Sequence, residues 1–182
     1  FDNLDQRWLM KFLEHDIADK NFLRYISRFL KSGIVENGAI LESDKGTPQG
    51  GQISPILANV YLHYVLDLWC ERILKKYVRG EIYYVRYADD FLLMFQYEEE
   101  AKRVLELLRT RLAKFGLEVA EDKTRILPIG RFKGTKEDFD FLGFTFFNTK
   151  TRGGKYRLGV RTSKKKQKMK KQAADFICEK YN

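Results

Sequence analysis

Two adjacent acids, Asp89 and Asp90, lie between two strongly apolar runs of the sequence. The runs, residues 83–87 and 91–95, are rich in aromatic and aliphatic side chains, which predicts two β-strands joined by a tight turn. Neighbouring carboxylates repel each other, and apolar strands beside them predict desolvation that raises this cost. A divalent cation relieves both effects, because Mg²⁺ prefers carboxylate and phosphate oxygens. The pattern indicates a metal-dependent phosphoryl or nucleotidyl transfer site, with an ordinary acidic turn as the alternative.

A shaped loop is expected upstream, at residues 46–55, which contain three glycines and two prolines. Glycines let backbone approach a ligand closely, and Gln49 offers both an amide donor and an amide acceptor in the middle of the loop. The Gly-Lys-Ser/Thr ending of a nucleotide-hydrolase phosphate loop is absent, which argues against that class. Ser54 is expected to cap the following helix, with Pro55 at its first position. A purely structural turn is the alternative.

Apolar periodicity and capping residues predict the elements that would position these side chains. Helices are expected after Asn3 or Asp5, over about 19–31, over about 55–78 and from 98 to about 115, and then as a basic terminal helix capped by Ser163. Strands are expected as hairpins at 34–41 and 83–95, as short segments at 117–119 and 124–127, as a pair within 139–147, and at 155–160. This order shows no regular βαβ repeat and predicts the α+β class.

The net charge of +9 is concentrated at the C-terminal end. Residues 150–182 hold 12 of the 34 Lys and Arg side chains and 2 of the 25 Asp and Glu side chains, which leaves the rest with a net charge of −1. This asymmetry predicts contact with a polyanion, with a solvated lysine-rich helix as the alternative.

Other features exclude several classes of protein. No apolar run reaches the roughly 18 residues of a membrane-spanning helix, and no signal peptide is recognised, so no membrane contact is expected. Cys70 and Cys178 lie far apart without metal-ligand spacing, which favours a reducing intracellular compartment. His15 and His63 have no second ligand at metal-binding spacing and are expected to be structural.

Four sequence blocks, in this order, resemble the reverse transcriptase family: Gly-Thr-Pro-Gln-Gly-Gly at 46–51 with the helix after it, Tyr-Ala-Asp-Asp at 87–90, Leu-Glu and Asp-Lys-Thr within 117–124, and Phe-Leu-Gly-Phe at 141–144. The version is most similar to bacterial group II intron-encoded reverse transcriptase/maturases. The resemblance implies an α+β polymerase palm, an antiparallel sheet packed on helices, over residues 1–161. Residues 162–182 would be a basic helical segment leading into the thumb or maturase region. The resemblance also implies that the protein is located in the bacterial cytoplasm.

The resemblance implies a role for individual residues. Asp89 would bind both of two catalytic Mg²⁺ ions, for which Mn²⁺ substitutes, with Asp90 as the partner carboxylate. The incoming nucleotide would contact Phe1 under its sugar, Gln49 and Gly50 beside it, and Lys123 near its phosphates. Primer and nucleic-acid contacts would come from Phe141, Leu142, Gly143 and Phe144, and from Lys164, Lys165, Lys166 and Lys168.

The sequence departs from the family pattern at its start. The family's other metal-binding Asp stands a few residues before the aromatic that corresponds to Phe1, so this Asp and the preceding fingers are not in this sequence. Two-metal chemistry needs carboxylates on both sides of the metal pair. We therefore expect a palm-centred fragment of a longer protein, with little or no activity by itself.

One function is predicted for the parent protein and a second is the alternative, and the two need not exclude each other. The first is RNA-directed DNA polymerase activity, with an RNA template, a DNA primer and a dNTP. The second is an RNA-binding maturase that uses the palm as a scaffold and the basic segment to grip intron RNA. Paired acids repel phosphate, so a pure splicing factor has no need of them, which favours the polymerase. A retron, CRISPR-linked or diversity-generating reverse transcriptase ranks lower because of the Asp-Lys-Thr and Phe-Leu-Gly-Phe surroundings.

Overall fold

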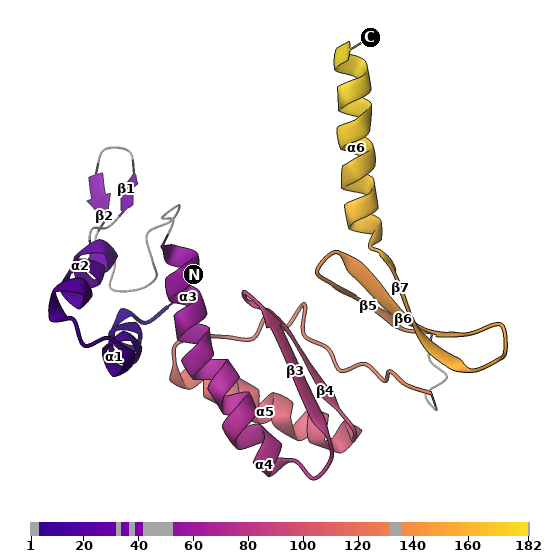
Figure 1. Cartoon of the computed structure of the whole chain (residues 1–182), viewed down its shortest axis with the longest axis horizontal. Helices are drawn as coiled ribbons and strands as arrows, with labels where there is room; N and C mark the ends of the chain where they lie inside the picture. The colour runs from indigo at the N-terminus through magenta and orange to yellow at the C-terminus, as the bar shows by residue number, and fades with distance from the viewer. Residues whose placement is uncertain (1–3, 32–33, 37–38, 42–52, 132–135, 182) are drawn as a thin grey trace. The chain divides into compact units, whose positions relative to one another are not determined.

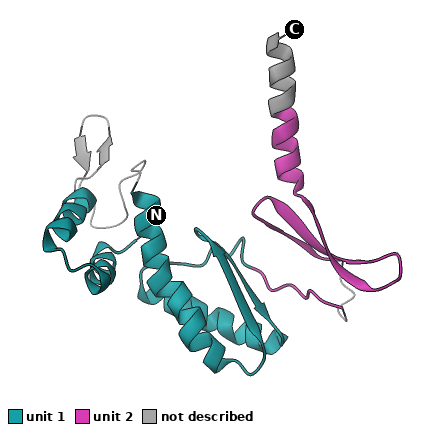
Figure 2. Cartoon of the chain, in the orientation of Figure 1, with its two compact units in different colours: residues 1–124 teal, residues 125–182 magenta. Residues whose placement is uncertain are grey.

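The computed structural model describes residues 4–31, 34–36, 39–41, 53–131 and 136–181 of the 182-residue chain, and the side chains of 4–31, 53–131 and 136–172. The chain forms two compact units, Phe1–Thr124 and Arg125–Asn182, and each is described by itself (Figure 2). Both combine helices with antiparallel strands, so the α+β prediction is confirmed. The division predicted after residue 161 falls inside the second unit, and the assignment of a palm to residues 1–161 stays a prediction.

The first unit begins with two capped helices, α1 (Gln6–Asp16) and α2 (Lys20–Lys31). Asp5 accepts hydrogen bonds from the backbone N–H groups of the second and third residues of α1, at 2.8 and 3.3 Å. Asp19 caps α2 in the same way, at 2.8 and 3.2 Å. A side-chain acceptor at this position satisfies N–H groups that have no partner within the helix, which is why the sequence predicts both starts.

A short hairpin follows, formed by β1 (Ile34–Glu36) and β2 (Ala39–Leu41), as predicted.

A long helical segment then runs from Ser54 to Tyr77 (Figure 1). It consists of α3 (Ser54–Leu62), two π-helical turns, η1 (His63–Asp67) and η2 (Cys70–Leu74), and α4 (Lys75–Tyr77). Its start differs from the prediction, because Ile53 is the cap residue and Ser54 already belongs to the helix. The π-helical turns were not expected from the sequence.

The core of the first unit is formed by the long helical segment together with α1, α2 and α5 (Glu98–Lys114). Tyr61 lies at its centre, fully buried, and its hydroxyl donates a 2.6 Å hydrogen bond to the carbonyl of Phe115 just after α5. Burial raises the pKa of this phenol, so it stays a neutral donor. The buried apolar side chains around it include Leu9, Leu13, Leu30, Leu57, Val65, Leu66, Val104, Leu108 and Leu112.

One antiparallel hairpin, β3 (Ile82–Tyr87) with β4 (Asp90–Phe95), lies beside the long helical segment (Figure 1). Directly paired residues of an antiparallel ladder share a face of the sheet. Tyr84, Arg86 and the residues paired with them therefore form one face, and the apolar members of that face pack against the core. The opposite face carries the exposed side chains of Tyr83, Val85, Tyr87 and Met94.

The segment that connects the two units is not a strand. Residues 117–119 and 124–127 were predicted as strands, and the structure shows irregular backbone with a turn at Glu121–Lys123. The backbone N–H groups of Lys123 and Thr124 both donate to the carbonyl of Ala120, at 3.0 and 2.9 Å. Leu117 and Val119 pack against the core instead of pairing with another strand. Their alternation therefore reflects side-chain packing rather than a β ladder.

The second unit is a three-stranded antiparallel sheet followed by the basic helix α6 (Lys164–Tyr181). Its strands are β5 (Asp138–Phe141), β6 (Phe144–Lys150) and β7 (Tyr156–Thr162), in the order β5-β6-β7. The hydroxyl of Ser163 accepts a 3.3 Å hydrogen bond from the N–H of Lys166, which confirms the predicted cap.

Within the described residues, no helix has the length and apolar character that crossing a bilayer requires.

Candidate functional site

The two acids lie at the end of the β3–β4 hairpin. Tyr87 pairs with Asp90, so Ala88 and Asp89 form a two-residue turn and Asp90 is the first residue of β4. Ala88 has a φ of 53°, a conformation that disfavours residues with a Cβ by about 1–2 kcal/mol. Only the first turn residue has positive φ, which is the pattern of a type II′ turn, where glycine is usual. This hairpin therefore presents Asp89 on a strained turn.

Both acids are exposed to solvent, so the predicted desolvation around them is wrong for the described chain. The physical reason is the orientation of the strands. The apolar residues Tyr83, Val85 and Tyr87 lie on the face that is open to solvent, and Asp90 shares this face with its pairing partner Tyr87. The two carboxylates are thus free to take ligands from solution.

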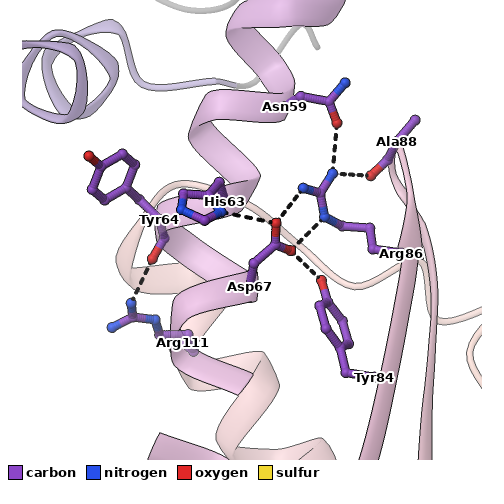
Figure 3. Close-up of polar contacts among 8 residues, drawn as sticks. All are labelled: Asn59, His63, Tyr64, Asp67, Tyr84, Arg86, Ala88 and Arg111. Carbon is purple, nitrogen blue, oxygen red and sulfur yellow. Dashed lines mark hydrogen bonds and ion pairs between the residues drawn. The ribbon is translucent and has the colours of Figure 1, made fainter. Parts of the chain in front are cut away.

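Arg86, on the opposite face of β3, ties the turn to the long helical segment (Figure 3). Its Nη1 donates to the carbonyl oxygen of Ala88 at 2.9 Å and to Oδ1 of Asn59 at 2.7 Å. Its Nε and Nη2 donate to the two carboxylate oxygens of Asp67, at 2.7 and 2.6 Å. The side chains of Arg86 and Asp67 are only 11% and 21% exposed. This is a two-point charge-assisted pair, the strong form of a hydrogen-bonded ion pair.

Two further groups contact the same carboxylate. The Tyr84 hydroxyl donates to Asp67 Oδ1 at 2.8 Å, and His63 Nδ1 lies 3.3 Å from Asp67 Oδ2. The side chain of His63 is half-exposed, and its expected structural role stays a prediction. The exposed His15 contacts Asp16 and the Tyr64 hydroxyl, at 2.9 and 3.2 Å.

The electrostatics of this network follow from its contacts. Burial alone would raise the pKa of Asp67, but the hydrogen bonds from Arg86 and Tyr84 and the charge of Arg86 together lower it below the ordinary value. Burial, and then the bond to Asp67, raise the pKa of the Tyr84 phenol. The bond to Asp67 raises the pKa of Arg86. Asp67 is therefore the anion, and the other two are donors, at neutral pH.

Asp67 belongs to the π-helical turn η1, and Arg111 of α5 binds the same turn (Figure 3). Arg111 Nε and Nη2 donate to the backbone carbonyls of Val65 at 3.1 Å and Tyr64 at 3.3 Å. Its guanidinium also lies 4.6 Å from the centre of the Phe115 ring. Arg111 thus supplies donors to carbonyls of a helical turn whose hydrogen bonding departs from the α pattern.

Lys123, predicted to lie near nucleotide phosphates, is exposed in the Glu121–Lys123 turn of the same unit as Asp89. Arg109 of α5 holds this turn through a two-point contact with Glu121, in which Nε and Nη2 each donate at 2.8 Å. The bond from Arg109 lowers the pKa of Glu121. The turn that carries Lys123 is therefore attached to α5.

In the second unit, the predicted primer-contacting residues 141–144 form the β5–β6 hairpin turn. Leu142 and Gly143 have φ values of 50° and 78°, and their neighbours Phe141 and Phe144 pair directly. The carbonyl of Gly143 accepts a 3.0 Å bond from the N–H of Ser163. Lys166 crosses the same glycine and places its Nζ 5.3 Å from the Phe144 ring centre. The turn and the start of α6 are thus joined. The lysines predicted to contact nucleic acid, Lys164, Lys165, Lys166 and Lys168, are all exposed on that helix.

Phe1, Gln49 and Gly50 lie outside the described residues. Within the described part of the chain, no group of three or more His, Cys, Asp or Glu side chains is arranged to hold a metal ion. Asp89 and Asp90 supply two carboxylates of the type that Mg²⁺ prefers. Mg²⁺ is commonly bound by one or two carboxylates together with phosphates and water, so the pair fits that ion by donor type.

Sequence reasoning missed the residues that hold the turn: Asn59, Asp67, Tyr84, Arg86 and Arg111. One signal was available. Arg86 interrupts an apolar strand three residues before Asp89, and an arginine that faces a core requires a polar partner. The identity of that partner, 19 residues upstream, is not encoded in any local pattern.

Comparison with known proteins agrees with the motifs. The model of a family described as Reverse transcriptase (RNA-dependent DNA polymerase) matches residues 1–146. Group II intron-encoded protein LtrA of Lactococcus lactis subsp. cremoris is 32% identical over 163 residues, covering 78% of this chain and 27% of LtrA. Protein YkfC of Escherichia coli (strain K12) is 27% identical over 191 residues, covering 87% of this chain and 47% of YkfC.

A third relative is the Putative COX1/OXI3 intron 1 protein of Saccharomyces cerevisiae, 26% identical over 192 residues, covering 79% of this chain and 22% of that protein. The chain therefore spans less than half the length of each of these three relatives. The predicted resemblance to group II intron-encoded proteins is confirmed by the similarity to LtrA. Because the family model covers most of the chain, the chain belongs to the reverse transcriptase (RNA-dependent DNA polymerase) family.

Proposed function

We propose that the protein containing this chain is an RNA-directed DNA polymerase that extends a primer by nucleotidyl transfer, and that Asp89 and Asp90 are its carboxylates in this chain. The observation that carries the proposal is the strained two-residue turn at Ala88–Asp89, which presents adjacent exposed carboxylates at the end of the β3–β4 hairpin. Arg86 holds this turn through a hydrogen bond to the Ala88 carbonyl. Strain at a tight turn persists only where surrounding contacts maintain it, and such sites are often functional.

The chain's own residues would act on a primer 3′-hydroxyl that attacks the α-phosphate of a dNTP, with pyrophosphate leaving. Asp89 and Asp90 would hold two Mg²⁺ ions, which when bound supply Lewis-acid stabilisation of the attacking and leaving oxygens. Lys123, exposed on its turn, would place a cation near the departing phosphates, where negative charge develops. The turn at residues 141–144, where Leu142 and Phe144 are exposed, would contact the primer strand.

We also propose that residues 1–182 have little catalytic activity by themselves. Two-metal chemistry needs carboxylates on both sides of the metal pair, and Asp89 and Asp90 would supply one side. Residues 1–182 alone are therefore expected to be inactive or nearly so.

The test is extension of a DNA primer on an RNA template with dNTPs and Mg²⁺, using the longest natural polypeptide that contains this sequence. Asp89→Asn should lower the rate by about 10³-fold, because it removes a charged ligand from the reacting centre. Glu99→Gln is a matched control, since it neutralises an exposed acid at the start of α5, away from the turn. If Asp89→Asn keeps more than a tenth of the wild-type rate, Asp89 is not a catalytic ligand.

A second function, binding of structured intron RNA as a maturase, is favoured by one observation. The first two turns of α6 expose six lysines, Lys164, Lys165, Lys166, Lys168, Lys170 and Lys171, with no acid among them. Such a surface suits phosphate contacts, and its affinity for RNA should fall steeply with salt whether or not Mg²⁺ and dNTP are present. Salt-independent RNA binding would exclude this role for α6.

A further inference from the structure

We infer that Arg86 and Asp67 are positioning residues for Asp89. Arg86 donates to the carbonyl of Ala88, Asp67 holds the Arg86 guanidinium, and the two together fix the turn that presents the Asp89 carboxylate. The inference rests on the proposed function, since it assigns these residues a part in the same reaction. Neither residue is needed to contact a substrate for this role, because they act through the backbone of the turn (Figure 3).

The first step is the conformation of the turn. Ala88 adopts a φ of 53°, which a free alanine rarely populates, so the peptide needs an external contact to remain there. The bond from Arg86 Nη1 to the Ala88 carbonyl, at 2.9 Å, is such a contact. Because a carbonyl lies in the plane of the peptide that follows it, holding the Ala88 oxygen also holds the N–H side of Asp89.

The second step is the rigidity of Arg86. Its guanidinium makes four polar contacts, at 2.6–2.9 Å, with the Ala88 carbonyl, Asn59 and the two oxygens of Asp67. The planar arginine guanidinium, with five N–H donors, can satisfy these acceptors together. A lysine ammonium cannot reproduce the two-point contact with the Asp67 carboxylate. The side chain is also 11% exposed, so water does not easily replace a broken hydrogen bond. Arg86 therefore fixes the turn relative to the long helical segment, because it bonds both.

The third step is the π-helical turn. In an uninterrupted α-helix, residues eight apart such as Asn59 and Asp67 point about 80° away from each other. A π-helical turn contains more residues per turn, which reduces this angle. The η1 turn, His63–Asp67, begins four residues after Asn59 and ends at Asp67, and both side chains contact the same guanidinium. Arg111 stabilises this geometry by donating to the carbonyls of Tyr64 and Val65.

The experiment compares Arg86→Lys with Arg103→Lys in the longest natural polypeptide that contains this sequence. Arg103 is a matched control, because its guanidinium also bonds a side chain, the Tyr77 hydroxyl at 2.9 Å, but on the surface of α5. For Arg86→Lys we expect kcat to fall about 10–100-fold, because misplacing a catalytic group by about 1 Å has an effect of this size. KM for dNTP should stay within about threefold of wild type. Arg103→Lys should leave both values unchanged.

Two readouts separate positioning from a general loss of structure. By ¹⁵N relaxation, the order parameter of the Asp89 amide should fall from about 0.85 to below about 0.6 in Arg86→Lys and stay high in the control. Ala88→Gly should recover part of the lost kcat when added to Arg86→Lys, because glycine adopts positive φ without strain. A merely structural role for Arg86 predicts instead that kcat recovers only as far as the lost thermal stability is regained.

The outcomes distinguish this inference from the proposed function. If Asp89→Asn is inactive but Arg86→Lys has wild-type kcat and an ordered Asp89 amide, the positioning role is refuted and the polymerase proposal stands. If Asp89→Asn is fully active, the polymerase role of the turn is refuted, and the inference that rests on it fails as well. A fall in kcat that is fully explained by thermal unfolding, without recovery by Ala88→Gly, also overturns the inference.

Discussion

Replacing Asp67 by Asn should destabilise the first unit in a pH-dependent way. The substitution keeps the shape of the side chain and removes its charge. It also replaces one acceptor oxygen by an NH₂ group, which would then face donors of Arg86 or Tyr84.

The size of the effect follows from the contacts. Asp67 accepts two charge-assisted bonds from Arg86 and one from Tyr84, and an Asn side chain can keep only part of this set. Breaking a fully buried pair costs about 3–5 kcal/mol, and a single bond to a charged group contributes about 1.5–3 kcal/mol. Asp67 is 21% exposed, so water compensates part of the loss, and we expect about 2–3 kcal/mol at pH 7.

The pH dependence has a definite sign. The pKa of Asp67 is lowered in the folded state relative to the ordinary value of 3.8. Its charge therefore contributes stability that is fully present above that value and is lost as the pH falls through the folded pKa. Asn does not titrate, so the difference between wild type and variant should be largest above about pH 5 and shrink below about pH 4.

Urea unfolding of both proteins at several pH values between 7 and 3 measures this difference directly. Asp16→Asn is a suitable control, because Asp16 is exposed and bonds Tyr64 and His15 at the surface. A difference below about 0.5 kcal/mol at pH 7, or one that stays constant down to pH 3, would refute the reasoning, because Asp67 would then not be a charged anchor.

Three further predictions concern other parts of the chain. Tyr61→Phe should cost about 1–2 kcal/mol in the free energy of unfolding, because the buried carbonyl of Phe115 loses its 2.6 Å donor; an unchanged urea midpoint would contradict this. Gly143→Ala should destabilise the second unit by about 1–2 kcal/mol, since its φ is 78° and a Cβ would meet Lys166 Cδ at 2.8 Å; thermal unfolding followed by circular dichroism tests it, and an unshifted Tm would count against it. Neutralising Lys164, Lys165 and Lys168, all exposed on α6, should weaken RNA binding. The slope of log K against log salt concentration should become shallower by about 0.7–0.9 for each phosphate that is no longer neutralised. An unchanged slope would show that α6 is not part of the RNA interface.

Much of the fold could be predicted because its signals are local. Asp5 and Ser163 cap helices through atoms two or three residues away, and the β3–β4 and β5–β6 hairpins are encoded by segments rich in apolar residues on both sides of short turns. The same local reasoning placed Asp89 and Asp90 at a tight turn. Identification of the family depended on four motifs in order, and the match over residues 1–146 agrees with it.

What could not be predicted depends on partners distant in sequence. Leu117 and Val119 alternate as a strand would, but they pack on helices and have no neighbouring strand among the residues that the structure describes. The orientation of β3 could not be read from its apolar residues either. Arg86 faces the helical segment, while Val85 and Tyr87 face solvent, because Asp67 offers the arginine a largely shielded charged acceptor.

Asp89 is proposed to act in the chemical step, on a turn that the rest of the unit holds in place. The most direct measurement is the single-turnover rate of one-nucleotide addition by wild type and Asp89→Asn, alongside the Kd of each for the same RNA template and DNA primer. We expect a rate about 10³-fold lower with a Kd within about threefold of wild type. An unchanged rate, or a loss of activity that saturating template and primer fully restore, would contradict the claim, because the residue would then affect binding rather than chemistry.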